Sequence, residues 1–273
     1  MVNSTPAPAG SARDPAFLRS VRPVLERYAS YFRAEVRGFE LLPSRGPFLV
    51  VGNHSGGQTP PDLPVLLTAW WRERGEEEPV YALFHSFFLG LPGVGPIMKR
   101  AGAVEAGPTE AEAILRSGGI LIDYPGGDSE VFRPWWERNR IEFGGRVGVV
   151  RLALRTGVPV VPAVSVGAHE SLIVLARGER VAKWLGLDRM FRIKVMPLVL
   201  GPPFGVVPGG IPTFPLPAKI TVELGPSIDW SSRYGPEAAE DESIVHRCYQ
   251  ELTETMQTTL DRLAAERRFP IFG

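Results

Sequence analysis

One histidine of this chain stands where α/β proteins often place catalytic groups. His54 comes after a short apolar run at residues 47–52 and Asn53, and a pair of glycines follows at residues 56–57. Ligands of open α/β sheets gather at the carboxyl ends of strands, and glycines let the backbone approach a ligand closely. Asp62, eight positions after His54, is a carboxylate that can fix the imidazole tautomer and stabilise its charged form. No obvious nucleophile accompanies this pair, so the pattern predicts a general base that acts on a substrate hydroxyl.

A second pair of glycines, Gly126 and Gly127, follows another apolar run at residues 119–124. Where a buried strand ends, their backbone amides can bind either a phosphate of a ligand or a developing oxyanion. A tight turn between a strand and a helix requires the same residue type, and that alternative stays open.

Arginines surround a pair of tryptophans, Trp135 and Trp136: these are Arg133, Arg138 and Arg140. Such a basic, aromatic cluster is typical of a boundary with lipid headgroups, and equally of a solvated loop over two packed tryptophans. No histidine, cysteine or carboxylate spacing predicts a metal site. The remaining candidates are interpreted as structural or surface residues: His85, His169, His246 and Cys248.

The apolar runs alternate with helical patterns along the chain. Runs bounded by glycine and proline predict strands of a sheet that is buried on both faces. The alternation predicts one α/β domain with a mixed, largely parallel sheet flanked by helices. Strands are expected at residues 47–52, 119–124, 158–166, 192–200 and 219–224, and helices at 63–74, 109–117, 145–156 and 236–268.

Two apolar segments are interpreted separately. Residues 80–98 are interrupted by His85, Pro92 and Pro96, which argues against a transmembrane helix, because such a helix needs about 20 apolar residues. We expect a buried or interfacial helix followed by a turn. Residues 201–217 are rich in glycine and proline, so no regular structure is expected there. They form a loop that covers a site, enters lipid, or packs on the sheet.

The N-terminus and the composition set further bounds. Residues 1–13 are expected to be disordered, and residues 14–273 to form the domain. Asp14 and Pro15 begin an amphipathic helix that either lies on a bilayer or packs on the protein. Lys+Arg and Asp+Glu both number 30, which argues against nucleic-acid binding.

Four stretches, in order, resemble the motifs of the glycerolipid (lysophospholipid/1-acylglycerol-3-phosphate) acyltransferase superfamily. The Asn-His pair followed by an aspartate resembles the first motif, and residues 95–100 (GPIMKR) resemble the second. Residues 124–130 (YPGGDSE) stand where the third motif is expected, and residues 158–164 resemble the fourth. The resemblance covers about residues 47–166, with a family-like ending at residues 215–226.

The sequence departs from the family pattern in two places. The family has His-x4-Asp, whereas Thr59 stands at that position here and Asp62 comes three residues later. We expect the longer loop to return Asp62, rather than Thr59, to His54. In the third motif Gly126 replaces the usual glutamate, which is similar to the mono- and diacylglycerol acyltransferase branch and to its neutral acceptors.

The resemblance implies an O-acyltransferase of phospholipid or glycerolipid synthesis. It would move a fatty acyl group from an acyl-CoA or acyl carrier protein thioester to a hydroxyl of a glycerolipid or lysophospholipid. His54 would be the base and Asp62 its partner, with acyl-CoA as co-substrate and no other cofactor or metal. The arginine and tryptophan cluster at residues 133–140 would then fit the mouth of the acyl-CoA site as well as a headgroup boundary. The enzyme would be cytoplasmic and peripheral on the inner face of the cell membrane. The implied substrate-binding residues are Lys99, Arg100, Gly126, Gly127, Asp128, Glu130 and Arg133.

Two other functions remain open. Residues 163–167 (AVSVG) resemble a degenerate nucleophile elbow, which would make the protein a serine hydrolase that uses Ser165 with His169 or His246. A non-catalytic lipid-binding protein is the second alternative, and it is favoured if Asp62 does not reach His54.

Overall fold

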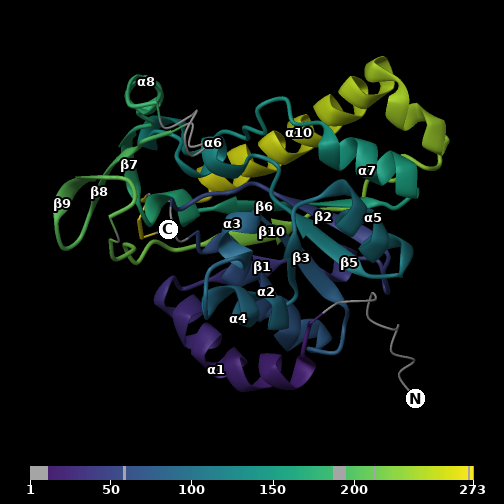
Figure 1. The fold of residues 1–273 in the computed structure, drawn as a ribbon, viewed down its shortest axis with the longest axis horizontal. Helices are drawn as coiled ribbons and strands as arrows, with labels where there is room; N and C mark the ends of the chain where they lie inside the picture. Colours follow the sequence, from purple (N-terminus) through teal and green to yellow (C-terminus); the bar gives the residue numbers. More distant parts are fainter. Residues whose placement is uncertain (1–11, 58–59, 187–194, 212, 270, 273) are drawn as a thin grey trace.

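The computed structural model describes residues 12–57, 60–186, 195–211, 213–269 and 271–272 (Figure 1). Residues 1–11 of the expected disordered N-terminus and Thr59 lie outside this range. The strands are β1 (Glu35–Arg37), β2 (Phe48–Gly52), β3 (Val80–Phe84), β4 (Ala103–Glu105), β5 (Ile120–Asp123), β6 (Val160–Val166), β7 (Ile173–Ala176), β8 (Leu198–Gly201), β9 (Gly205–Pro208) and β10 (Thr221–Leu224). The α-helices are α1 (Pro15–Tyr31), α2 (Asp62–Arg74), α3 (Ser86–Leu89), α4 (Val94–Arg100), α5 (Pro108–Arg116), α6 (Gly127–Val131), α7 (Gly148–Thr156), α8 (Glu179–Trp184) and α10 (Glu242–Ala265). Short 3-10 turns are η1 (Phe39–Leu41), η2 (Trp135–Glu137), η3 (Ala168–Glu170) and η4 (Pro236–Glu240).

A seven-stranded sheet forms the centre of the molecule, in the order β1-β10-β6-β2-β5-β3-β4. Strands β6, β2, β5, β3 and β4 are parallel to one another, whereas β10 runs antiparallel to β6 and pairs with β1 in parallel. The expected mixed, largely parallel α/β fold is confirmed. A second, antiparallel sheet of β7, β8 and β9 extends from one side (Figure 1).

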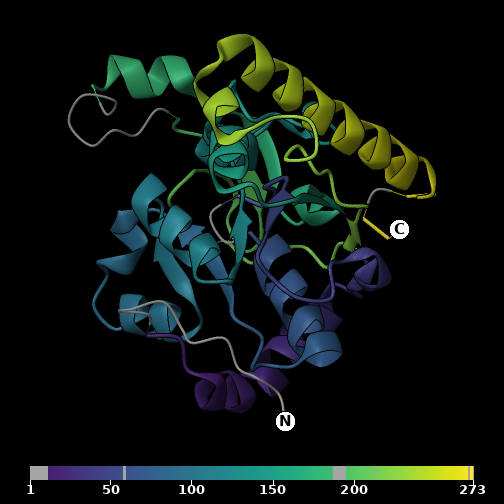
Figure 2. The same ribbon diagram turned by 90° about the vertical axis from the view of Figure 1, so that its right-hand side faces the viewer.

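The two faces of the central sheet carry separate hydrophobic cores. Helices α5, α7 and α10 pack on the face that presents Leu49, Val51 and Leu121. Helices α1 and α2 cover the opposite face, which presents Phe48 and Val50, and Figure 2 shows α10 and α1 on opposite sides. Because neighbouring side chains of a strand point to opposite faces, β2 must be apolar at every position. All five residues of β2 are buried, so His54 emerges from the centre of the sheet.

The expected helix within residues 80–98 is wrong at its start. Residues 80–84 form β3, which pairs in parallel with β5 and β4, and only the short helices α3 and α4 follow. A fully buried strand and a buried helix have similar apolar runs, so periodicity alone does not separate them. Among the described helices, none is both long and apolar enough to cross a bilayer.

Two further boundaries differ from expectation. Residues 205–208, expected to be irregular, form β9, whose backbone pairs with β8 at the edge of the small sheet, where proline is tolerated. The C-terminal helix begins at Glu242, because the Asp241 side chain accepts hydrogen bonds from the first free amides. The Asp14 cap of α1 is confirmed by its bond from the Phe17 amide. Of the strand expected at residues 192–200, positions 192–194 lie outside the described range.

Candidate active site

The end of β2 is fixed to its neighbour β6 by a buried asparagine. The side-chain amide of Asn53 donates to the carbonyl of Ser165 (2.9 Å) and its oxygen accepts from the Ser165 amide (2.7 Å). Asn53 is fully buried, so both bonds form away from water, where an unmade bond is costly. This clamp sets the position of His54, the next residue.

His54 and Asp62 lie next to each other. The Nδ1 atom of His54 is 3.3 Å from the Oδ2 atom of Asp62. The Asp62 side chain is 1% exposed, whereas the His54 ring is 22% exposed. Since Nδ1 faces the buried carboxylate, Nε2 is the ring nitrogen left for a substrate. The pair therefore has the arrangement of a base and the group that orients it.

The Asp62 carboxylate has further partners that hold it in place. Oδ2 accepts the Ser55 amide (2.7 Å), and Oδ1 accepts the Ser165 hydroxyl (2.9 Å). Asp62 is the first residue of α2, and its oxygens bond these groups rather than the helix end. Asp62 is therefore not a simple helix cap.

Glycine makes the return of this loop possible. Gly56 has a φ of 100° and Gly57 a φ of 71°, values that favour glycine. A Cβ atom on Gly56 would lie 2.5 Å from the Cδ atom of Pro61. Without that close approach the chain would have to take a wider path before reaching Asp62.

Tyr124, at the end of the neighbouring strand β5, packs on His54. The two ring centroids are 4.7 Å apart and the ring planes are inclined by 31°. Gly52 leaves room for the Tyr124 ring, because a Cβ atom there would lie 2.4 Å from it. Burial raises the pKa of the preceding Asp123 to about 6, and the nearby His54 and Arg146 act in the opposite direction. Neither Tyr124 nor Asp123 was predicted as a site residue, although the end of an adjacent parallel strand was a usable signal.

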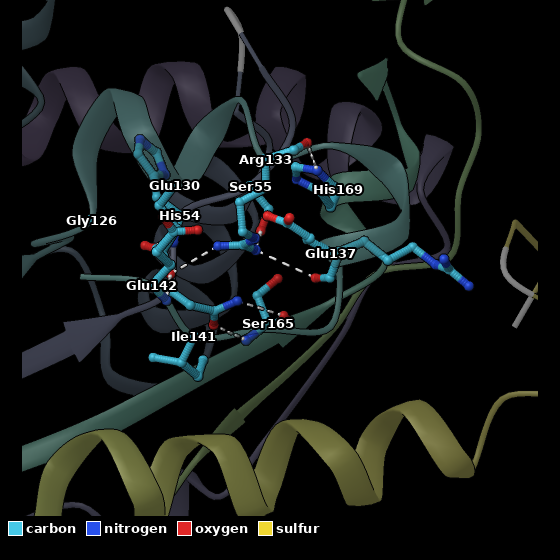
Figure 3. Close-up of polar contacts among 12 residues, drawn as sticks. His54, Ser55, Gly126, Glu130, Arg133, Glu137, Ile141, Glu142, Ser165 and His169 are labelled. Atoms are coloured by element: carbon cyan, nitrogen blue, oxygen red, sulfur yellow. Dashed lines mark hydrogen bonds and ion pairs between the residues drawn. The ribbon is translucent and has the colours of Figure 1, made fainter. Parts of the chain in front are cut away.

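Glu130 supports the backbone of His54 (Figure 3). Its Oε2 accepts the His54 amide (2.9 Å), and its Oε1 accepts the Glu142 amide (3.1 Å). Oε1 also lies 3.0 Å from the Arg133 guanidinium, and both side chains are fully buried. Burial raises the pKa of Glu130 to about 7, and Arg133 opposes this effect. In this structure Glu130 and Arg133 therefore face the protein interior, not an open binding surface.

Arg133 connects Glu130 to Ser55 of the His54 loop, to Arg138 and to His169. Its Nη2 donates to the Ser55 hydroxyl and to the Arg138 carbonyl, both at 3.3 Å. The Nε2 atom of His169 donates to the Arg133 carbonyl (2.6 Å). Burial lowers the pKa of His169 to about 3, and the charge of Arg133 adds to this effect. His169 is thus a neutral structural histidine.

Gly126 and Gly127, the glycine pair after β5, have different structural roles. A Cβ atom on Gly126 would lie 2.0 Å from Glu130, so this glycine makes space for the buried carboxylate. The Gly127 amide donates to the Tyr124 carbonyl (3.3 Å), which closes the turn. In the part of the chain that the structure describes, the Gly126 amide has no acceptor. Asp128 is exposed and pairs with Arg146 (3.1 Å).

Lys99 and Arg100 lie at the end of α4, apart from this cluster. Arg100 donates to Asp14 (2.7 Å) and stacks over the Phe17 ring at 4.2 Å. Within the described ranges, no hydrogen bond or ion pair joins either side chain to the His54 loop or to α6. The structure therefore brings together His54, Asp62, Glu130 and Arg133, and it leaves Arg100 at the first helix.

Ser165 is not placed as a nucleophile elbow would place it. An elbow exposes its serine on a sharp turn between a strand and a helix. Ser165 lies inside β6, is buried, and pairs with Val222 of β10. Its hydroxyl bonds Asp62, and the nearby His169 is engaged by Arg133. The serine-hydrolase alternative loses its geometric basis, and Ser165 becomes a support for Asp62.

Known proteins resemble this chain in sequence and in fold. The acyltransferase family model matches residues 33–166. The chain is 33% identical over 262 residues to an uncharacterised protein of Mycobacterium tuberculosis, covering 95% of this chain and 70% of that protein. It is 28% identical over 208 residues to a human protein named DGAT1/2-independent enzyme synthesizing storage lipids, covering 76% of this chain and 56% of that protein. Its fold resembles the 1-acyl-sn-glycerophosphate (LPA) acyltransferase of Thermotoga maritima, with a TM-score of 0.57 and 18% identity over 91% of this chain and 80% of that one.

Proposed function

This chain belongs to the glycerolipid acyltransferase superfamily, and from that premise we propose that it transfers a fatty acyl group from an acyl-CoA or acyl carrier protein thioester to a hydroxyl of a glycerolipid. The observation that carries the proposal is the partly exposed His54 ring beside a buried, hydrogen-bonded Asp62.

The mechanism follows from the two ring nitrogens of His54. Nε2 removes the proton of the acceptor hydroxyl while the hydroxyl oxygen attacks the thioester carbonyl carbon. Asp62 holds Nδ1–H and stabilises the imidazolium that forms. The tetrahedral oxyanion is stabilised by the Gly126 amide, which the structure leaves without an acceptor among the described residues. Collapse of this intermediate breaks the C–S bond, and the thiolate receives the proton from the imidazolium.

A neutral acceptor, such as a mono- or diacylglycerol, is the acceptor class that the contacts favour. Two of the arginines implied as substrate-binding are already engaged, Arg100 by Asp14 and Arg133 by Glu130. The similarity to the human storage-lipid enzyme supports the same choice. A lysophospholipid remains the second acceptor class.

Thiol release from acyl-CoA, measured against a panel of acceptors, tests this function. We expect release that depends on an added hydroxyl acceptor and is faster with mono- or diacylglycerols than with lysophospholipids. Release at the same rate without any acceptor would indicate thioester hydrolysis. No release above the protein-free rate with any acceptor, from acyl-CoA or acyl carrier protein, would contradict the proposal.

The substrate class requires access to lipid, and we propose that the small sheet with α8 makes the contact on the inner face of the cell membrane. Val199 and Val207 face its buried side, whereas Leu198, Leu200 and Val206 are exposed. Among the described residues between positions 173 and 214, the most exposed apolar side chains are Trp184 (83%), Phe214 (69%) and Phe204 (63%). Aromatic side chains of this kind are enriched where protein meets the headgroup boundary.

Sedimentation with anionic liposomes tests this contact. We expect the wild-type protein to pellet with vesicles, and Trp184→Asp or Phe204→Asp to weaken binding by about tenfold or more, because each removes a large apolar side chain from the lipid. Val24→Asp, at an exposed position of α1, is the matched control and should leave binding unchanged. It distinguishes a contact through the small sheet and α8 from a contact through α1. A wild-type protein that stays in the supernatant would refute membrane binding.

A further inference from the structure

A cavity lined largely by arginines lies beside the C-terminal end of α10. It has a volume of about 210 Å³ and is lined by Arg138, Asn139, Glu170, Ala264, Arg267 and Arg268. It forms where the segment after η2, the turn η3 and the end of α10 meet. Arg138 connects it to the active site, because the Arg138 carbonyl and the Ser55 hydroxyl both accept hydrogen bonds from Arg133.

Arginines outnumber carboxylates among the described residues that line this cavity. Three arginines line it against one carboxylate, Glu170, which is 2% exposed. One Glu170 oxygen pairs with Arg267, and the other lies 3.4 Å from the Nε atom of Arg138. That Nε atom is buried and lacks hydrogen-bond geometry. Over the described ranges, Arg268 has no carboxylate within ion-pair distance, and it is exposed. Among the described residues, Arg138, whose Nε lacks a hydrogen bond, and Arg268 therefore present positive charge to the cavity.

We propose that this cavity binds the phosphate group of a phosphate-bearing ligand. Arginine forks match phosphate oxygens, so a phosphate would give Arg138 and Arg268 an anionic partner. Arg138 stacks on Trp135, with its guanidinium carbon 4.6 Å from the ring centroid, which presets its orientation. The exposed Trp136 offers an aromatic face close by in the chain.

Two sources of phosphate fit the proposed function, on which this choice of ligands rests. One is the nucleotide end of coenzyme A, which the Trp136 ring could stack against. The other is the glycerophosphate headgroup of a lipid. Both ligands carry a phosphate monoester, and they differ in the group attached to it. A soluble fragment of each ligand can therefore show which of the two the cavity binds.

Isothermal titration with adenosine 3′,5′-bisphosphate and with glycerol 3-phosphate tests the proposal. We expect the wild-type protein to bind at least one of them, and Arg268→Gln and Arg138→Gln each to weaken that binding by about tenfold, the effect of one charge-assisted contact. Arg116→Gln, which removes an exposed, ion-paired arginine of α5, is the control and should leave binding unchanged. Stronger binding of the bisphosphate assigns the cavity to coenzyme A, and stronger binding of glycerol 3-phosphate assigns it to a lipid headgroup.

Two results would overturn the proposal. One is a wild-type protein that binds neither compound, and the other is binding that survives Arg268→Gln unchanged. Because Arg268 is exposed and has no ion-pair partner among the described residues, its variant should fold and decides the question even if Arg138→Gln does not. The titration needs no turnover. Phosphate binding without thiol release would therefore refute the proposed function alone, and thiol release without phosphate binding would refute this proposal alone.

Discussion

Replacement of His54 by alanine is expected to lower acyl transfer by about 100- to 10,000-fold, the usual effect of losing a general base. The fold should survive, because the ring is partly exposed and the contact to Glu130 is made by the His54 backbone amide. The rate of acceptor-dependent thiol release, together with the thermal unfolding midpoint, gives the measurement.

The matched control is His246→Ala. His246 is an exposed histidine of α10 whose ring contacts only Glu242 of the same helix in the described part of the chain. Its variant should retain full activity, which excludes a general effect of losing a histidine. If His54→Ala released thiol at nearly the wild-type rate, the general-base mechanism would be wrong.

Replacement of Asp62 by asparagine is expected to reduce turnover by about 100-fold or more, because a neutral amide no longer stabilises the imidazolium or selects its tautomer. The two side chains have nearly the same shape, so the amide can still fill the buried position between Ser55 and Ser165. The value of kcat should fall far more than KM rises, since Asp62 acts on His54 and does not touch the acceptor.

Two further variants serve as comparisons for Asp62→Asn. Ser165→Ala removes only the hydrogen bond to Asp62 Oδ1 and should cost about tenfold or less. Thr59→Val should retain activity, because we expect Asp62 and not Thr59 to be the partner of His54. Loss of activity in Ser165→Ala, with His54→Ala still active, would return the serine hydrolase as the better explanation.

The sequence predicted much of the architecture because burial leaves a local pattern. The run at residues 47–52 is apolar without alternation, as a strand covered on both faces must be, and β2 occupies residues 48–52. The same reasoning fails at residues 80–84, where a continuous apolar run predicts a helix and the structure has the buried strand β3. Propensity and periodicity describe one segment at a time. They therefore identified the carboxyl end of the strand after which His54 lies, but not the residues that surround His54.

The sequence by itself determined that His54 follows a buried strand and that a glycine pair and a carboxylate come after it. Only the tertiary structure decided which groups meet there. Glu130 is 76 residues from His54 and Ser165 is 103 residues from Asp62, and their contacts depend on the strand order and on the path of the loop after Gly56. Tyr124 reaches His54 for the same reason, through the pairing of β2 with β5. Glu130 and Arg133 look like surface ligands in the sequence, and they lie buried because the fold closes over them.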